Sequence, residues 1–173
     1  MSDEIDPGNG GMWRVIRTDV AANRGHPRSQ LVLCLFRLTR HMRLSRHRAV
    51  RAAGRVVGVW YRVLVEWVFG IEIPWETRIG PGLRIHHGTG LTISPNCVVG
   101  SNVLLRHGVT LGGRRTDSDC PELADGVDIG AGAILLGAIR VGEAARVGAG
   151  SVVLHDVPDG AFAVGNPARV LEP

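Results

Sequence analysis

Side chains suited to acid–base chemistry lie close together in the middle of the chain. Two histidines are adjacent, His86 and His87, and a carboxylate, Glu72, lies fifteen residues before His87. An imidazole titrates close to neutral pH and can take a proton from a hydroxyl group. A carboxylate on its second ring nitrogen can fix the tautomer and stabilise the imidazolium. These residue types therefore suit general-base catalysis, although their spacing alone does not prove that they meet.

Weaker candidates follow these residues along the chain. His107 could contact a substrate, but its place in the pattern described below favours a structural role, and His26, Arg106 and His155 are expected at the surface. The segment 112–121 begins with two glycines, is rich in charge and ends in proline, so it predicts a loop. Loops on rigid scaffolds often carry function, and a plain surface insertion is the alternative. Its polar and reactive side chains include Arg114, Arg115, Asp119 and Cys120.

A six-residue repeat predicts the scaffold that must position these side chains. The repeat matches neither the 3.6-residue period of a helix nor the two-residue period of a lone strand. Three turns of six residues form one triangular coil of a parallel β-helix, and twelve repeats predict about four coils. The pattern has one clear departure, the fourteen residues from Val109 to Leu123. The repeating positions are Ile79, Ile85, Leu91, Cys97, Val103, Val109, Leu123, Ile129, Leu135, Val141, Val147 and Val153.

The N-terminal third has a helical pattern instead. Residues 1–11 are polar and glycine-rich and are predicted to be disordered. Helices are expected over 13–22, 29–44 and 47–69, with Gly70 as the stop signal. The chain therefore divides into a helical cap, 12–70, and a β-helix domain, 71–173, which includes the loop 112–121 and a C-terminal segment.

The third of these helices carries an apolar face that needs a partner. We expect this face to pack on the first coil or on a neighbouring subunit, and contact with a membrane surface is the less favoured alternative. No uncharged run approaches the roughly 20 residues that a spanning helix needs, because Arg62 and Glu66 interrupt the best candidate.

Composition narrows the class of protein. All twenty basic residues are arginines, and twelve of them lie in residues 1–70 against five acids, whereas residues 71–173 hold eight arginines and eleven acids. A solvated basic face is the favoured interpretation, because few aromatic residues and no reader motif support nucleic-acid binding. The three cysteines lack metal-site spacing, which predicts free thiols, no metal and a reducing, cytoplasmic setting.

Several segments together resemble one enzyme family. Residues 70–113 read GIEIPWETRIGPGLRIHHGTGLTISPNCVVGSNVLLRHGVTLGG, and DGVDIGAGAILLGAIRVGEAARVGAGSVV and VGNPARV follow. From about residue 13 to residue 170 the chain resembles the serine O-acetyltransferase family of hexapeptide-repeat, left-handed β-helix acyltransferases. The IHHG, RHGVTLGG and Cys120-Pro121 segments are similar to its short branch, which includes colanic-acid-type polysaccharide O-acetyltransferases.

The resemblance implies acetyl transfer from acetyl-CoA to a hydroxyl by direct attack. It assigns the general base to His87 and the orienting carboxylate to Glu72. It also places His86 where the family has an aspartate that helps to hold serine. Asp119 and Cys120 replace an arginine–histidine pair of the family's serine-binding loop, and Arg114 and Arg115 in the same loop could compensate for the lost cation.

Two acceptors follow from this comparison of motifs. L-serine is the acceptor that the family name implies, and the products then belong to cysteine biosynthesis. The loss of two serine-holding features favours the alternative, a sugar hydroxyl in polysaccharide biosynthesis or a secondary-metabolite intermediate. A catalytically silent β-helix scaffold is the third alternative.

The resemblance also implies where the coenzyme lies. In the family, acetyl-CoA occupies a groove between neighbouring β-helices, so a homotrimer is expected, and a cysteine synthase partner is not, because the isoleucine-ended tail is missing. Small residues let an extended arm approach the backbone closely, and arginine pairs well with phosphate. The positions implied are Gly112, Gly113, Ala131, Gly132, Ala149 and Gly150, with Arg146 and Arg169 for the phosphates.

Overall fold

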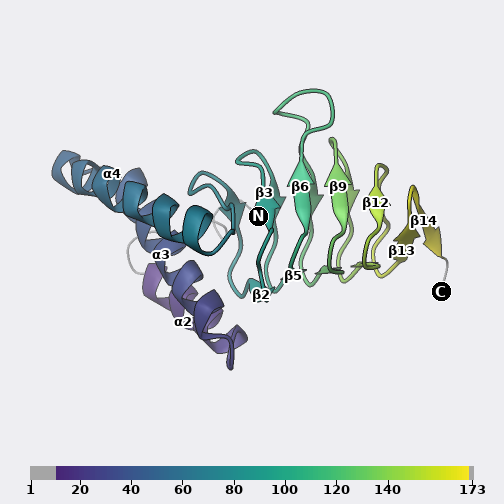
Figure 1. The fold of residues 1–173 in the computed structure, drawn as a ribbon, viewed down its shortest axis with the longest axis horizontal. Coiled ribbons are helices and arrows are strands. Elements are labelled where there is room, and N and C mark those ends of the chain that lie inside the picture. Colours follow the sequence, from purple (N-terminus) through teal and green to yellow (C-terminus); the bar gives the residue numbers. More distant parts are fainter. Residues whose placement is uncertain (1–10, 172–173) are drawn as a thin grey trace.

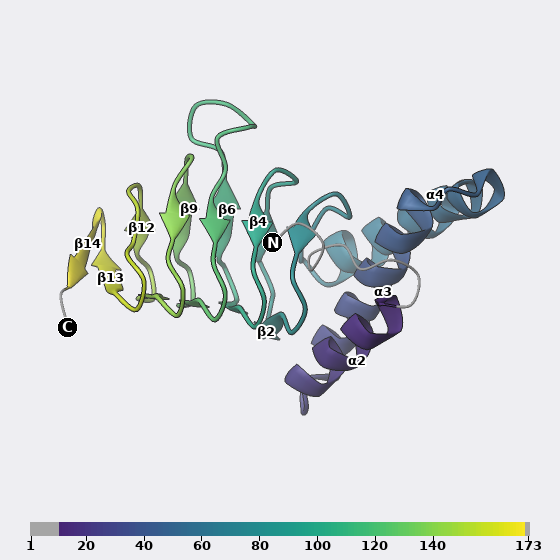
Figure 2. The ribbon, with the colours of Figure 1, turned by 180° about the vertical axis from the view of Figure 1, so that it is seen from behind.

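The computed structural model describes residues 11–171 and has helices at one end of a straight stack of coils (Figure 1). The view from behind shows the same order, with β13 and β14 at the end opposite the helices (Figure 2). Residues 1–10 of the segment predicted to be disordered lie outside the described residues. The helical elements are α2 (Met12–Ala22), α3 (Pro27–Leu44), α4 (Arg48–Arg62) and the π-helical segment η1 (Val63–Val68).

Short strands form the three faces of the stack. One sheet has the order β1-β4-β7-β10, the second β14-β13-β11-β8-β5-β2, and the third β12-β9-β6-β3. All pairs are parallel except the closing hairpin β13–β14. The strands are β1 (Arg78–Ile79), β2 (Arg84–His86), β3 (Thr92–Ile93), β4 (Val98–Val99), β5 (Leu104–Arg106), β6 (Thr110–Gly112), β7 (Glu122–Leu123), β8 (Asp128–Ile129), β9 (Ile134–Leu136), β10 (Arg140–Val141), β11 (Arg146–Val147), β12 (Val152–Val153), β13 (Phe162–Gly165) and β14 (Ala168–Leu171).

The repeating aliphatic residues fill the inside of the stack. All twelve positions of the predicted repeat are at most 3% exposed. Stacked coils remove these side chains from water, and burying one of them contributes roughly 1.5–3 kcal/mol. The prediction of a parallel β-helix of about four turns with an N-terminal helical cap is therefore confirmed.

The pairing register corrects one detail of the predicted repeat. Ile85 pairs with Leu105, twenty residues away, whereas Ile93 pairs with Leu111 at the regular eighteen. Two extra residues therefore lie between β2 and β3, after His86 and before Thr92, and the expectation of a single departure is wrong. The repeat hid this insertion because Leu91 and Ile93 both point inward and are both buried. The second insertion is the expected loop, across which the pairing distance is twenty-four residues, as from Leu111 to Leu135.

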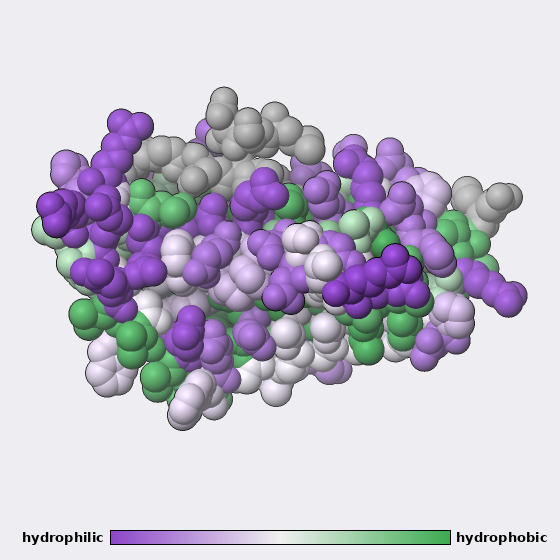
Figure 3. Space-filling model, turned by 90° about the horizontal axis from the view of Figure 1, so that it is seen from above, coloured by the Kyte–Doolittle hydropathy of each residue, from purple (hydrophilic) through white to green (hydrophobic). Residues whose placement is uncertain are grey.

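The third predicted helix is present, but its apolar face is not covered. The helical segment ends at Val68, two residues before Gly70, whose φ of +62° fits the predicted stop. Its buried residues are Gly54, Tyr61 and Val65, whereas Trp60 and Trp67 lie in solvent. Hydrophobic groups are visible on the outer surface at the helical end (Figure 3). Packing of this face on the first coil is therefore wrong, and the other half of the expectation, packing on a neighbouring subunit, stays a prediction.

The cap docks on the first coil through hydrogen bonds to its backbone. The first coil has no preceding coil, so its backbone groups need other partners. The Asn23 side-chain amide donates to the Leu83 carbonyl at 2.7 Å and accepts from the Ile85 N–H at 3.0 Å. The Ser29 hydroxyl donates to the Ile85 carbonyl, and the Tyr61 hydroxyl to the Ile73 carbonyl, both at 2.7 Å.

A buried ion pair completes this docking. Arg37 Nε donates to Asp19 Oδ2 at 2.8 Å, and both side chains are at most 7% exposed. The other guanidinium nitrogens donate to the carbonyls of Ile79 and Gly80, while Asp19 Oδ1 accepts the Gly82 N–H at 2.7 Å. One pair of charges therefore satisfies three backbone groups of the first coil.

Removing the buried carboxylate should destabilise the protein strongly. Asp19→Ala leaves the guanidinium of Arg37 without a counter-charge, which should lower the free energy of unfolding by about 3–5 kcal/mol. Urea denaturation followed by circular dichroism measures the loss. Glu143→Ala, which removes an exposed carboxylate, is the control and should change stability by less than about 0.5 kcal/mol. Equal effects of the two variants would contradict the role given to Asp19.

Candidate active site

His87 projects from the turn that the two extra residues create. It follows β2 directly, is exposed, and has a φ of +66°, a left-handed conformation that few non-glycine residues adopt. Backbone hydrogen bonds hold the turn, from the Thr89 N–H to the His87 carbonyl and from the Gly90 N–H to the Gly70 carbonyl, at 2.8 and 2.7 Å. The strained conformation is thus fixed by its neighbours, a situation common at functional sites.

Three further imidazoles surround His87. The His26 ring stacks on the His86 ring with centroids 4.7 Å apart, and it meets His87 edge-on at 6.2 Å. The ring of His107, one coil further on, meets His87 edge-on at 6.1 Å. The expectation that His26 is a plain surface residue is therefore wrong. Sequence reasoning missed it because the turn between α2 and α3 reaches the site only through the Asn23 and Ser29 contacts.

The environment of His86 favours its neutral form. Partial burial lowers the pKa of His86, and the nearby His26, Arg106, Arg84 and His87 lower that pKa further. Arg106, expected at the surface, is half-buried and forms an ion pair with Asp128 beside His86 on the same sheet. A neutral imidazole can donate one hydrogen bond and accept another, so His86 can bind a polar, uncharged group.

The backbone of Glu72 is hydrogen-bonded to residues that follow the His87 turn. Its N–H donates to the Leu91 carbonyl at 2.8 Å, and its carbonyl accepts the Ile93 N–H at 2.9 Å. The two extra residues set this register, because Glu72 pairs with Thr92, twenty residues on, whereas eighteen-residue coils would have paired it with residue 90. Among residues 11–171 the structure has no hydrogen bond or ion pair between the Glu72 carboxylate and His87. Catalytic hydrogen bonds often tighten only when substrate is bound, so the pairing stays a prediction.

The loop between β6 and β7 is organised by its own side chains. The Asp119 carboxylate accepts hydrogen bonds from the backbone N–H groups of Arg114, Arg115 and Thr116, at 2.8–3.4 Å. These bonds lower the pKa of Asp119. A Cβ on Gly113 would overlap the Thr116 carbonyl oxygen, so the loop needs glycine there. Of the predicted substrate-binding groups in the loop, Asp119 thus shapes the loop, and the two arginines are exposed.

The thiols near this loop pack rather than react. Cys120 is 6% exposed, and its sulfur contacts the Ser94 hydroxyl and the Asp117 carbonyl, both at 3.3 Å. Burial, followed by the neighbouring Cys120, raises the pKa of Cys97 to about 12. Cys34, Cys97 and Cys120 are free thiols, as expected.

A line of small residues continues from the His87 turn along one edge of the stack. The Gly108 N–H donates to the Thr89 carbonyl, the Gly132 N–H to the His107 carbonyl, and the Gly150 N–H to the Ala131 carbonyl, at 2.8–2.9 Å. Among residues 11–171, apart from each glycine's own chain neighbours, no atom lies within 4 Å of a Cβ placed on Gly132 or Gly150. Four of the predicted coenzyme positions therefore share this edge, which we call the glycine edge: Ala131, Gly132, Ala149 and Gly150.

The remaining coenzyme candidates lie at other places. Gly112 and Gly113 are at the opposite end of the strand β6, where the loop begins. Arg146 is exposed on β11, with its guanidinium 5.6 Å from the centre of the Phe162 ring. Arg169 is exposed on β14, where it pairs with Val164 of β13. The strand β13 in turn pairs with β11.

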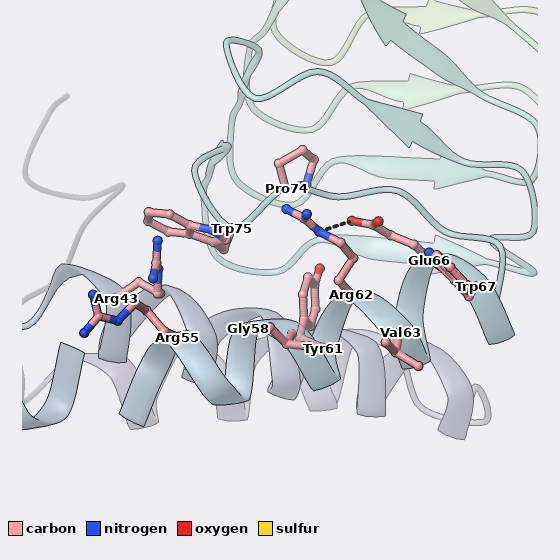
Figure 4. Close-up of a pocket in the computed structure, with 11 residues that line it drawn as sticks. Arg43, Arg55, Gly58, Tyr61, Arg62, Val63, Glu66, Trp67, Pro74 and Trp75 are labelled. Carbon is pink, nitrogen blue, oxygen red and sulfur yellow. Dashed lines mark ion pairs between the residues drawn. The ribbon is translucent and has the colours of Figure 1, made fainter. Parts of the chain in front are cut away.

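Three described hollows are lined by residues other than these histidines. One, of about 400 Å³, lies between the helical cap and the segment Pro74–Trp75, and it is lined by Arg43, Arg55 and Arg62 among others (Figure 4). Arg62 there pairs with Glu66 at 3.6 Å. Within the described residues no group of three or more His, Cys, Asp or Glu side chains is arranged to hold a metal ion.

Comparisons with known proteins place the chain among acetyltransferases. It is 48% identical over 113 residues to the proposed colanic acid biosynthesis acetyltransferase WcaB of Escherichia coli K12, covering 65% of this chain and 70% of that protein. Soybean serine acetyltransferase complexed with serine matches with a TM-score of 0.76 and 35% identity, covering 98% of this chain and 72% of that one. A serine acetyltransferase in complex with CoA matches with a TM-score of 0.77 and 29% identity, covering 98% and 73%. No family model matches the chain.

The length and strength of these similarities settle the family. The two solved structures match across helices and coils alike, and the similarity to WcaB spans more than two thirds of that protein. With the exposed histidine at the start of the glycine edge, this assigns the chain to the serine acetyltransferase family, in which it is an acyltransferase of the β-helix type.

Proposed function

We propose that this protein is an acetyl-CoA-dependent O-acetyltransferase in which His87 is the general base. The observation that carries the proposal is the exposed imidazole at the start of the glycine edge, where backbone and small side chains leave open space. The CoA complex of a similar acetyltransferase supports the coenzyme.

His87 would act on the acceptor while the acceptor attacks. The acceptor oxygen forms a bond to the thioester carbonyl carbon as its proton passes to the imidazole. The resulting tetrahedral intermediate breaks its bond to sulfur, and the imidazolium returns the proton to the leaving thiolate. The products are an acetyl ester and CoA, and no covalent enzyme intermediate is needed.

Glu72 would position His87 during this cycle. A carboxylate that accepts a hydrogen bond from the imidazole fixes its tautomer and stabilises the imidazolium. The backbone of Glu72 is held in register with Thr92, five residues after His87, and its side chain is exposed.

A groove between copies of this chain would hold the coenzyme. The outward side of the sheet β12-β9-β6-β3 is apolar in its later coils, where Ile134, Leu136, Val152 and Leu154 are half-buried in a single chain. Packing of that side against a neighbour would place the glycine edge at a subunit boundary. A homotrimer is therefore proposed, with Arg146 and Arg169 near the coenzyme phosphates.

Two acceptors are proposed for the same chemistry. L-serine is supported by the serine complex of a similar enzyme. A sugar hydroxyl is favoured by the stacked rings of His26 and His86, which offer hydrogen bonds but no negative charge for an ammonium group. The loop carboxylate of Asp119 is occupied by backbone N–H groups, so it does not replace the missing charge.

Loss of the base should nearly abolish turnover. His87→Ala should lower kcat by about 10²–10⁴-fold while leaving CoA affinity unchanged, because the imidazole acts on the acceptor proton. Thiol release from acetyl-CoA measures kcat, and titration with CoA measures affinity. His155→Ala, which removes another exposed histidine, is the matched control and should keep kcat. Full activity of His87→Ala would refute the proposed role.

The orienting carboxylate should affect turnover less than the base does. Glu72→Gln should lower kcat by about tenfold or more with little change in KM, because the amide cannot stabilise an imidazolium. Glu76→Gln removes a neighbouring exposed carboxylate and serves as its control. If both variants keep wild-type kcat, Glu72 has no part in the mechanism.

The acceptor can be tested with one substitution at the histidine stack. His86→Asp should lower KM for L-serine, because a carboxylate can pair with its ammonium group, by about tenfold. For a sugar acceptor the same change should lower kcat/KM, since it removes the stack with His26. Thiol release with serine and with a panel of sugars compares the two. Efficient serine acetylation by the unmodified chain would eliminate the sugar alternative.

A further inference from the structure

The helix α4 and segment η1 present an apolar stripe to solvent. Val56, Trp60 and Trp67 are 61%, 69% and 81% exposed, and Val59 and Val63 are exposed beside them. We call these five residues the outer stripe. A surface helix ordinarily turns its apolar stripe toward the core, but α4 turns Gly54 and Tyr61 inward instead. Exposed apolar patches of this kind mark interaction surfaces.

Spacing supports the view that the stripe is one continuous face. Its residues recur at intervals of three and four, as from Val56 to Val59, Trp60 and Val63. Alanines extend the same face toward the start of α4, at Ala49, Ala52 and Ala53, all exposed. The face thus runs along most of α4, with small alanine side chains at its N-terminal end and tryptophans at its C-terminal end.

Positive charge lines the stripe. Arg48, Arg51, Arg55 and Arg62 are exposed on α4, and α4 itself contains no acid. The hollow of Figure 4 joins the two properties, because three arginines line it together with Val59, Val63 and Trp67 of the stripe. Between residues 11 and 70 the chain holds twelve arginines and two acids, and both acids are already paired with arginines.

We propose that α4 and η1 lie on the surface of an anionic lipid bilayer. The outer stripe would enter the interface between head groups and acyl chains, where tryptophan is favoured. The arginines would extend along the apolar surface and place their guanidinium groups among lipid phosphates. No described helix is long and apolar enough to cross the bilayer, so the contact is peripheral.

Charge distinguishes a lipid surface from a second copy of the chain. A two-fold contact through the stripe would bring the same arginine-rich flanks together, and these flanks would repel each other. An anionic bilayer satisfies both the stripe and the arginines. The sequence alone made membrane contact the less favoured alternative, and the exposure of the stripe reverses that order. The proposal does not depend on which acceptor is acetylated.

Vesicle flotation tests the proposal with the full chain. Vesicles of phosphatidylcholine with about 30% phosphatidylglycerol should bind the protein at least about tenfold more strongly than phosphatidylcholine alone. Added salt should weaken the binding, since it screens the arginines. Flotation with neither vesicle would overturn the proposal.

Paired variants separate the stripe from the charge. Trp60→Ser combined with Trp67→Ser should lower binding by about tenfold or more. Trp13→Ser, which removes a tryptophan that is 63% exposed on α2, is the matched control and should bind as the unmodified chain does. Arg48→Gln combined with Arg55→Gln should remove the preference for anionic vesicles. An equal loss in the Trp13 control would overturn the assignment to this face.

Mass and activity measurements complete the test. Thiol release with a soluble acceptor should be unchanged in the double tryptophan variant, which shows that it is folded. Light scattering should give the same assembly mass for that variant and for the unmodified chain. A smaller assembly with undiminished flotation would identify the stripe as a contact between copies and would overturn the proposal.

Discussion

The unpaired backbone edge of the first coil is the constraint on which the structure depends. Every later coil finds its hydrogen bonds on the coil before it, but the first coil has none before it. The helical cap supplies the missing partners through side chains. Asp19, Asn23 and Arg37 form hydrogen bonds with backbone groups between Ile79 and Ile85. An unpaired strand edge would also invite association with other strands. The cap is therefore part of the β-helix in energetic terms, although it is separate in secondary structure.

The same docking explains how the cap reaches the candidate site. Asn23 at the end of α2 and Ser29 in the first turn of α3 fix β2, and His26 lies between them in the sequence. Wherever β2 lies, His26 must lie against His86. Stability and the composition of the candidate site thus arise from one contact surface, and the cluster of imidazoles is built from segments sixty residues apart in the sequence.

Much of the scaffold could be predicted from the sequence because its signal is periodic. The repeat from Ile79 to Val153 identified the interior residues, and glycine with proline marked the loop 112–121. The insertion beside His87 could not be read, because Leu91 and Ile93 are both aliphatic and either can continue a six-residue repeat. Glu72 was named from resemblance, since its register depends on that insertion.

Long-range contacts were beyond the reach of local pattern. Nothing near His26 in the sequence indicates that it stacks on His86, and nothing near Asp119 indicates that its carboxylate binds the N–H groups of Arg114 to Thr116. The apolar residues of α4 were recognised, but their direction was not. At Gly54, α4 lies so close to α3 that a Cβ there would be 2.9 Å from the Cβ of Met42. The glycine therefore faces α3, and the large apolar residues of α4 face away from it.

The number of coils also sets the length of the glycine edge. Neighbouring strands lie about 4.8 Å apart, so the three steps from Gly90 to Gly150 span roughly 14 Å. Each coil pairs only with its neighbours, so a coil could be gained or lost without changing the others. Such a change would nevertheless move Arg169 by one whole step relative to His87. The number of coils thus sets the distance between His87 and Arg169, and with it the length of any ligand that contacts both.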